Sequence, residues 1–392
     1  MTGAGLRAYR GPALFSFGFR PFFLFGALWA ALAAPLWAAV YLAGGAQVLG
    51  QAGVDWHVHE TLFGYLGAVI AGFLLTAVPN WTGRLPVTGA PLAGLFGLWA
   101  AGRLAMLAAA WLGVAAAAID CLFLVALAAV LSREVAAGRN WRNLPVCALV
   151  SGLALANVGL HLRVLWPEVA DIAERLALAA PALLVALIGG RITPSFTLNW
   201  LKQQGAGALP RPFGLADRVA LAGTAIALVA WVCEPLALAS GVILVLAGPA
   251  LLLRLSRWRG AATLREPLLW VLHVGYAWLS LALALLGLSI LAPGLVPRTA
   301  AIHALTVGAF GVMTLGVMTR ATLGHTGRPR TADRATLGIY LAANAAAALR
   351  VAAALAPAAA APLLAAAAAA WCAAFLGFAA AYGPMLARAR LP

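Results

Sequence analysis

Charged side chains are scarce in this sequence. Asp, Glu, Lys and Arg make up only 9% of the 392 residues, whereas 64% are hydrophobic and the mean hydropathy is +0.96. A soluble globular domain has about a quarter of its residues charged, so this chain lacks the polar groups that would cover a water-facing surface. The composition excludes a soluble fold and indicates that lipid is the solvent.

The motifs of common soluble enzymes are missing as well. The four cysteines form no C-x-x-C pair, which excludes a zinc ribbon and a thioredoxin-like site. The sequence has neither a G-x-G-x-x-G nor a Walker loop, and the dipeptide His59-Glu60 is not part of an H-E-x-x-H zinc-protease motif. The longest polar stretch, residues 191–216, is too short for a soluble domain.

Long apolar runs make up most of the chain. About 20 apolar residues cross the roughly 30 Å hydrocarbon layer of a bilayer, and these runs are continuous rather than alternating, which favours helices over an outer-membrane barrel. We predict an all-α polytopic membrane protein that forms a single transmembrane domain over residues 1–392. Its twelve helices are expected near 21–43, 57–78, 91–111, 114–132, 144–163, 169–190, 217–233, 235–254, 266–290, 299–320, 334–355 and 361–387.

The basic residues set the orientation of these helices. Of the 26 Lys and Arg residues, Arg103 falls inside a helix and four fall on one side of the membrane, namely Arg163, Arg175, Arg298 and Arg350. The remaining 21 fall on the other side, which is therefore expected to be cytoplasmic. Both termini are predicted on that side of the membrane. This topology explains the net charge of +15 without nucleic acid, and we expect no such partner.

Histidine is rare, and its six copies are unevenly placed. In the predicted topology His57, His59, His161 and His303 share the depth of the outer membrane face. His273 lies about two turns inside the cytoplasmic end of its helix, and His325 lies in the loop after helix 299–320. Polar side chains in membrane segments are by default functional candidates. We therefore predict that the outer four bind metal or haem, with hydrogen bonding at the headgroup level as the alternative.

The two histidines of the second helix face opposite ways if the segment is α-helical, because residues i and i+2 are about 200° apart. His57 shares its face with Glu60. His59 shares its face with Phe63 and Leu66, an apolar wall suited to a porphyrin. We therefore expect two centres, one on each side of this helix, with Glu60 as a proton carrier beside the second.

An internal repeat relates the second helix to the tenth. A shift of 244 positions places His59 on His303 and the tripeptide Thr-Gly-Arg at 82–84 on the same tripeptide at 326–328. An Asn-Trp pair after the sixth helix echoes the one after the second, so helices 2, 6 and 10 are predicted to head three four-helix units. We predict His59 and His303 as the two axial ligands of one haem b.

Several other polar residues are assigned to the two centres. His161 is predicted to join His57 and Glu60 in the second centre, as copper ligands or around a second haem. Arg103 needs an anionic partner inside the membrane, either a haem propionate or Asp120 on the next helix. Asn157 lies one turn before His161 and is expected to orient its imidazole.

A further polar group lies on the cytoplasmic half of the ninth predicted helix. His273, Tyr276 and Ser280 fall on one face. They are interpreted as a quinol pocket, as a second haem site, or as a buried hydrogen-bonded trio. His325 matches Trp81 under the 244-residue shift rather than another histidine, which disfavours it as a ligand.

Five segments carry a resemblance to a known family. The segments "ALFSFGFRPFFLFGALWAALAAPLW", "WHVHETLFGYLGAVIAGFLLTAVPNWTGRLP", "LIGGRITPSFTLNWL", "PLLWVLHVGYAWL" and "HALTVGAFGVMTLGVMTRATLGHTGRP" resemble the signature blocks of the NnrS family. The resemblance implies a bacterial inner-membrane protein that contains haem and copper and takes part in nitric oxide metabolism. Twelve helices in three units are also similar to the catalytic subunits of haem-copper oxidases, but the His-His pair of their copper site is absent here.

Two functions of different class follow from the residues and the resemblance. In the first, nitric oxide or a related nitrogen oxide is reduced at a haem or haem-copper centre with electrons from quinol. In the second, a non-catalytic haem protein senses, buffers or hands on nitric oxide, haem or copper. A transporter is a third alternative, although no pair of broken helices at mid-membrane supports it.

Overall fold

The computed structural model describes residues 9–391, and every regular element in that range is a helix. The elements are η1 (Ala13–Phe15), α2 (Phe19–Leu42), α3 (Gly45–His59), η2 (Glu60–Leu66), α4 (Gly67–Thr82), α5 (Ala90–Leu107), α6 (Ala109–Leu112), α7 (Val114–Ala137), η3 (Trp141–Asn143), α8 (Leu144–His161), α9 (Pro167–Leu184), η4 (Val185–Gly189), α10 (Gly190–Gln203), α11 (Leu215–Cys233), α12 (Leu238–Ser256), η5 (Gly260–Thr263), α13 (Pro267–Leu291), α14 (Arg298–His303), η6 (Ala304–Gly311), α15 (Val312–His325), α16 (Arg334–Leu355), η7 (Pro357–Ala359) and α17 (Ala360–Ala387).

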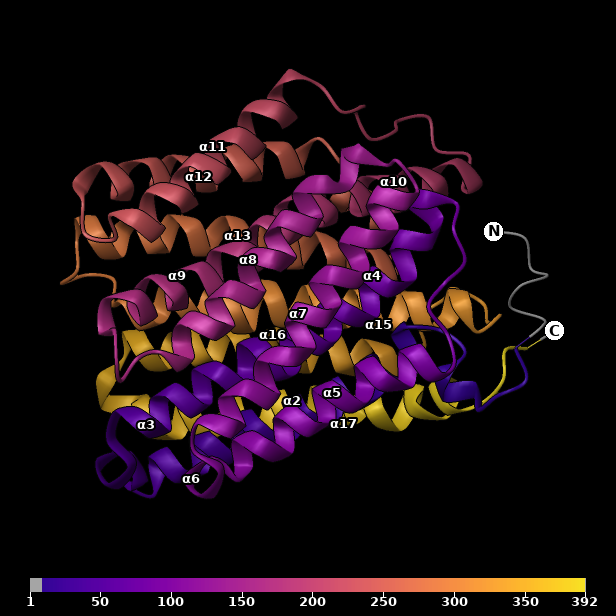
Figure 1. Ribbon diagram of the computed structural model, residues 1–392. Coiled ribbons are helices and arrows are strands. Elements are labelled where there is room, and N and C mark those ends of the chain that lie inside the picture. The colour runs from indigo at the N-terminus through magenta and orange to yellow at the C-terminus, as the bar shows by residue number, and fades with distance from the viewer. Residues whose placement is uncertain (1–8, 392) are drawn as a thin grey trace.

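Twelve helices of the described range are long and apolar enough to cross a membrane, which confirms the predicted number. An even number of spans brings the chain ends to one side, and the segments that lead to them lie at the same end of the bundle (Figure 1). Residues 1–8 and 392, on which the predicted cytoplasmic termini fall, lie outside the described residues. The end that carries α3 and α6 is called the outer end below, and the opposite end the basic end.

The sixth span is the main departure from the predicted boundaries. It runs over Pro167–Gln203 rather than 169–190, because α10 continues the helix into the polar stretch. Thr193, Thr197 and Leu201 recur at four-residue spacing in α10 and are all buried, and α10 packs against α13. Burial against a neighbouring span therefore extends the helix where hydropathy alone predicts its end.

Spans 2, 6 and 10 are the inner helices of the bundle. The buried share of their most apolar segments is 83%, 67% and 72%, and no other span in the described range exceeds 50%. Each inner span contains a π-helical segment, which is η2 in span 2, η4 in span 6 and η6 in span 10. Because η2 and η6 start 244 residues apart, the repeat seen in the sequence is also present in the backbone. Such π segments are rare and often mark functional sites.

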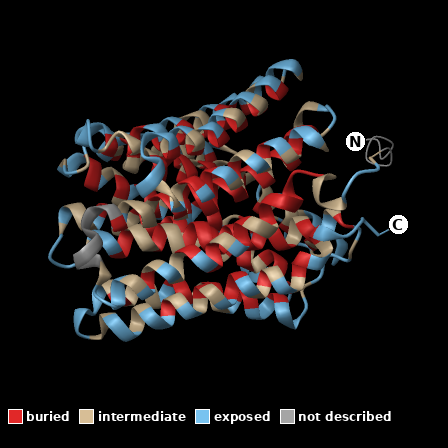
Figure 2. Cartoon of the chain, turned by 60° about the horizontal axis from the view of Figure 1, so that its bottom comes forward, coloured by how far each residue is buried: buried red, intermediate tan, exposed pale blue. Residues whose placement is uncertain are grey.

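The other nine spans surround these three helices. The last span, α17, packs against both α16 and the first span, α2, so the two ends of the chain close the bundle. Buried residues follow the middle of the molecule and exposed residues cover its outside (Figure 2). Many of the exposed residues are large and apolar, such as Leu104, Leu155 and Leu246, each about two-thirds exposed. An apolar exterior of this extent suits lipid and not water.

A buried arginine stabilises the π segment of span 6. Arg254 of α12 is 1% exposed and donates through Nη1 to the Ala186 carbonyl at 2.9 Å and through Nη2 to the Gly190 carbonyl at 3.1 Å. Its Nε donates to Asp217 at 3.1 Å, and its Nη1 also contacts the Tyr276 hydroxyl at 2.7 Å. Carbonyls that a membrane helix does not use itself need another donor, and Arg254 supplies it here.

Candidate metal centre

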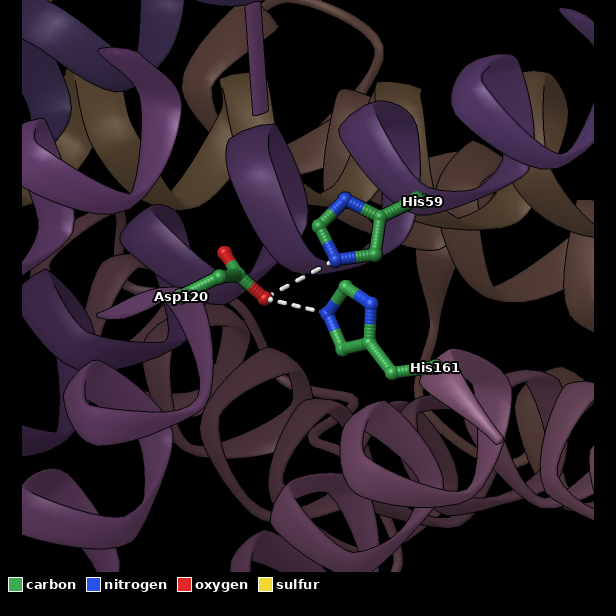
Figure 3. Close-up of side chains that lie close together, drawn as sticks. All are labelled: His59, Asp120 and His161. Carbon is green, nitrogen blue, oxygen red and sulfur yellow. Dashed lines mark hydrogen bonds and ion pairs between the residues drawn. The ribbon is translucent and has the colours of Figure 1, made fainter. Parts of the chain in front are cut away.

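Three side chains from three spans converge at the outer end of the bundle (Figure 3). His59 is the last residue of α3, Asp120 lies in the first turns of α7, and His161 is the last residue of α8. The Nε2 atoms of His59 and His161 lie 2.9 Å and 3.1 Å from the same oxygen, Oδ2 of Asp120. One ligand atom from each residue lies within 4.8 Å of the others, as a metal ion requires. His59 and Asp120 are fully buried, and His161 is 15% exposed.

The orientation of His59 is that of a metal ligand. Its Nδ1 atom lies 2.9 Å from Oε1 of Glu60, while Nε2 faces Asp120 and also lies 3.0 Å from Oδ1 of Asn157. Metal-binding histidines commonly donate the proton of their second ring nitrogen to a carboxylate, which fixes the tautomer and the ring direction. Glu60 accepts that proton here, and Nε2, which lies against oxygens of Asp120 and Asn157, is the ring nitrogen that would face an ion.

Arg103 connects the two carboxylates of the site. Its Nη1 donates to Oε2 of Glu60 at 2.6 Å, and its Nη2 donates to Oδ1 of Asp120. The structure therefore pairs Arg103 with Asp120, one of its two predicted partners. The His59 ring also lies between the two carboxylates, so one guanidinium and one imidazole face Glu60 and Asp120 in the buried interior. Because an unpaired buried charge is costly, the second carboxylate needs a cation beside it, which either a protonated imidazole or a bound metal ion can supply.

Asn157 supports the centre in a different way from the one predicted. It was expected to orient His161, but its Nδ2 donates to Oδ2 of Asp120 at 2.8 Å and its Oδ1 faces His59. Asp120 therefore contacts both histidines, Arg103 and Asn157. From the sequence, Asp120 is predicted only as an ion-pair partner of Arg103. Its position in the middle of a long apolar run is the signal that could have identified it as a ligand.

Two glycines allow the helices of the site to approach closely. A Cβ atom at Gly102 would lie 3.0 Å from Oδ1 of Asp120. A Cβ atom at Gly64 would lie 2.7 Å from Trp29 Nε1, 2.8 Å from Arg103 Nη1 and 2.9 Å from Glu60 Oε2. The Gly64 carbonyl, in the π segment η2, accepts a hydrogen bond from Trp99 Nε1 at 2.8 Å. The backbone at Gly64 and Gly102 thus forms part of the wall of the site.

Gly64→Ala is expected to lower the free energy of unfolding by about 1–3 kcal/mol, the usual cost of overpacking a filled core. The new methyl group would displace Arg103 or Glu60, so bound metal should fall as well. Thermal unfolding in detergent and metal content check this. Gly97→Ala is the matched control, because a Cβ there meets no atom of the described residues within 4 Å; an equal loss in both variants would show that crowding at residue 64 is not responsible.

An ion-pair cluster covers the outer side of the centre. Arg163, two residues after His161, places Nε 3.2 Å from Asp55, Nη1 3.0 Å from Asp171 and Nη2 3.0 Å from Glu174. These carboxylates belong to α3 and α9, so one side chain connects both helices to the turn that follows α8. The cluster restrains the turn that positions His161.

Arg163→Gln is expected to weaken metal binding about tenfold, in the lower part of the range seen when groups that orient ligands are lost. The physical reason is a looser α8–α9 turn and three carboxylates left without their shared cation. Metal titration of the purified variant measures the effect. Arg298→Gln removes an exposed charge at the same end and should leave affinity unchanged; a similar loss in that control would point to general electrostatics.

The structure groups the remaining outer histidines differently from the prediction. His59 and His303 were expected to share one haem, with His57, Glu60 and His161 around a second centre. Instead His59 lies with Glu60 and His161, while His57 lies near His303 and Arg350. The prediction assumed regular α-helical geometry over residues 57–60. In the structure Glu60 begins the π segment, and its side chain reaches back to the neighbouring imidazole.

His57 and His303 form a second outer cluster. The His57 ring stacks on Trp37 with centroids 5.7 Å apart, and its Nδ1 is buried and has no hydrogen-bond partner among the described residues. Nδ1 of His303 donates a hydrogen bond to the Thr299 carbonyl at 2.7 Å. Nε2 of the same ring takes no part in this hydrogen bond. Both rings therefore keep one nitrogen for a ligand.

The predicted trio on α13 separates into three independent contacts. Nε2 of His273 bonds Thr197 at 2.9 Å, Tyr276 bonds Arg254, and Ser280 donates to the Gly248 carbonyl at 2.5 Å. This arrangement agrees with buried hydrogen bonding, one of the three interpretations. His325 packs between Phe17 and Phe19, at centroid distances of 5.3 and 5.5 Å.

Sequence comparison gives an independent assignment of the chain. No protein with a curated description matches it. The family model described as NnrS protein matches residues 13–390, nearly the whole chain. The chain therefore belongs to the NnrS family of metal-binding membrane proteins linked to nitric oxide responses.

Proposed function

We propose that this protein holds copper at His59, Asp120 and His161, and that nitric oxide or a related nitrogen oxide is bound and reduced there with electrons from quinol. One observation carries the proposal: two imidazoles and a carboxylate from three spans converge in the buried interior, with ligand atoms close enough to share one ion. Imidazole nitrogen suits copper as well as zinc, iron and nickel, and copper is the one of these that the family resemblance implies. Bound copper would supply a redox-active cation to which a nitrogen oxide can coordinate.

The protein groups around the three ligands have separate roles in this proposal. Glu60 accepts the Nδ1 proton of His59 and is the carboxylate nearest to the ligand set, so it is placed to relay protons to the site. Arg103 donates to both Glu60 and Asp120 and holds them in place. Asn157 donates a hydrogen bond to Oδ2 of Asp120 and so holds this oxygen in position beside the two imidazoles. Reduction of two nitric oxide molecules to nitrous oxide and water consumes two protons and two electrons, so a buried acidic group beside the ligands has a use.

Haem b is proposed at the second outer cluster, with His57 and His303 as the ligands. His303 donates Nδ1–H to a backbone carbonyl, the usual arrangement of a histidine whose Nε2 binds a metal. The unpartnered Nδ1 of His57 and the nearby Arg350, a cation for a propionate, suit the same group. This assignment replaces the predicted pair of His59 and His303.

Metal and haem analysis of purified protein tests both sites before any activity is measured. His161→Ala should remove copper and leave haem, and His303→Ala should remove haem or change its spin state and leave copper. Electron paramagnetic resonance of the copper-loaded protein should show nitrogen coupling from imidazole that is lost in His161→Ala. Retention of full copper by both His59→Ala and His161→Ala would overturn the copper site.

Nitric oxide consumption separates the catalytic proposal from the non-catalytic alternative. With a quinol analogue as reductant, a reductase should consume nitric oxide continuously and form nitrous oxide, whereas a sensor or buffer should bind a fixed amount and stop. Loss of consumption in His161→Ala with retained haem would assign the reaction to the copper site. A stoichiometric end point in the metal-loaded wild type would favour the non-catalytic function.

A further inference from the structure

The metal centre is tightly packed on the side of the basic end. The next turns of its three spans place Phe63, Phe123 and Leu153 there, and these side chains are 1%, 2% and 0% exposed. A hydrated ion would have to lose its water to cross this apolar packing, which is costly. On the side of the outer end, His161 is 15% exposed, whereas the other two ligands are fully buried. The outer end is therefore the side from which an ion reaches a ligand first.

The turn after α8 closes the outer side of the centre. Val164 and Leu165 in this turn are 93% and 68% exposed, so little packing holds the turn in place. The side chain of Arg163 holds it instead, because its guanidinium group pairs with one carboxylate of α3 and two carboxylates of α9. One side chain makes all three ion pairs, so its release would free the turn next to His161.

The carboxylates of this ion-pair cluster attract cations. Asp55, Asp171 and Glu174 are 28%, 59% and 30% exposed, and together with Arg163 they carry three negative charges and one positive charge. An excess of one sign at an entrance raises the local concentration of ions of the opposite sign. A divalent cation can compete with Arg163 for these carboxylates, because it carries twice the charge. An acidic cluster alone indicates no metal site, but this one adjoins three ligand atoms that can share one ion.

We infer that the metal ion enters and leaves the centre from the outer end, past His161, and that Arg163 is the gate of this entrance. The inference rests on the proposed metal site and adds the route by which it is loaded. A cation that reaches the cluster displaces Arg163, and the freed turn exposes His161, which binds the ion first. When the ion has moved on to the buried ligands, Arg163 pairs with the carboxylates again and holds the turn closed.

Loading and release kinetics of the full-length protein in detergent test the inference. Divalent copper is mixed with metal-free protein, and the electron paramagnetic resonance signal after rapid freezing gives the loading rate. A chelator added to the loaded protein gives the release rate. Arg163→Gln should load copper about threefold faster and release it about thirtyfold faster, which together give the tenfold loss of affinity expected above. Arg163→Lys should have intermediate rates, because it keeps the charge without the fixed geometry of three ion pairs.

Three further measurements distinguish the gate from other roles of the cluster. Loading of the wild type should slow about threefold at high ionic strength, which screens the carboxylates; a rate independent of salt would contradict an entrance lined by them. Arg298→Gln, which removes an exposed charge at the same end, should keep both rates. Phe123→Leu loosens the packing on the other side and should also keep both rates; faster loading as large as in Arg163→Gln would overturn the route.

The same experiment separates a wrong gate from a wrong metal site. A wild type that binds copper, combined with wild-type loading and release rates in Arg163→Gln, would overturn the gate and leave the metal site standing. A wild type that binds no copper at all would overturn the metal site and the gate together.

Discussion

Asp120→Asn should reduce bound copper to less than a tenth of the wild-type content and lower the free energy of unfolding by about 3–5 kcal/mol. Asp120 is 1% exposed and contacts both imidazoles, Arg103 and Asn157. The amide removes the charge that balances Arg103, and breaking a buried ion pair from one side has a cost of this size. Metal content and chemical unfolding in detergent measure the two effects.

Asp171→Asn is the matched control for this substitution. Asp171 also pairs with an arginine but is 59% exposed, and exposed ion pairs contribute about 0–1 kcal/mol. Because Asp55 and Glu174 still pair with Arg163 in this variant, it should keep its copper and most of its stability. If Asp120→Asn loses stability but retains full copper, Asp120 has a structural role only, and the ligand set must lie elsewhere.

The number of spans was predictable because it depends on local sequence. Apolar runs long enough to cross lipid predict spans directly, and the described range contains twelve helices that are long and apolar enough to be these spans. The 244-residue repeat predicted that spans 2 and 10 are related in structure. In agreement with this, both spans contain a π segment at the corresponding position, η2 and η6. The extension of span 6 into α10 was missed because its buried face includes Thr193 and Thr197, which hydropathy counts as polar.

The grouping of the histidines was not predictable from spacing alone. Depth in the membrane correctly placed His59 and His161 at one level, but the partner of each histidine depends on which spans are neighbours. His59 meets His161 because α7 and α8 pack together beside span 2, a tertiary fact with no local signal. Glu60 was assigned to the face of His57 by α-helical angles, and its flexible side chain bonds His59 instead.

The charge balance at Arg103 gives the second large expected effect. Arg103→Met would leave Glu60 and Asp120 buried without their shared cation, and the free energy of unfolding of the metal-free protein should fall by about 3–5 kcal/mol. Arg103→Lys should lose less, because it keeps the charge but cannot form hydrogen bonds with both carboxylates in the same fixed geometry.

The double variant Arg103→Met/Glu60→Gln identifies the cause of that loss. It has the same net charge at the site as the wild type, so it should recover part of the stability lost in Arg103→Met, and residues that share a network commonly show coupling of about 0.5–3 kcal/mol. Copper should stabilise Arg103→Met more than it stabilises the wild type, because a bound cation replaces part of the missing charge. Additive losses in the double variant, with no extra stabilisation by copper, would show that Arg103 acts through packing and that Glu60 and Asp120 do not attract the metal.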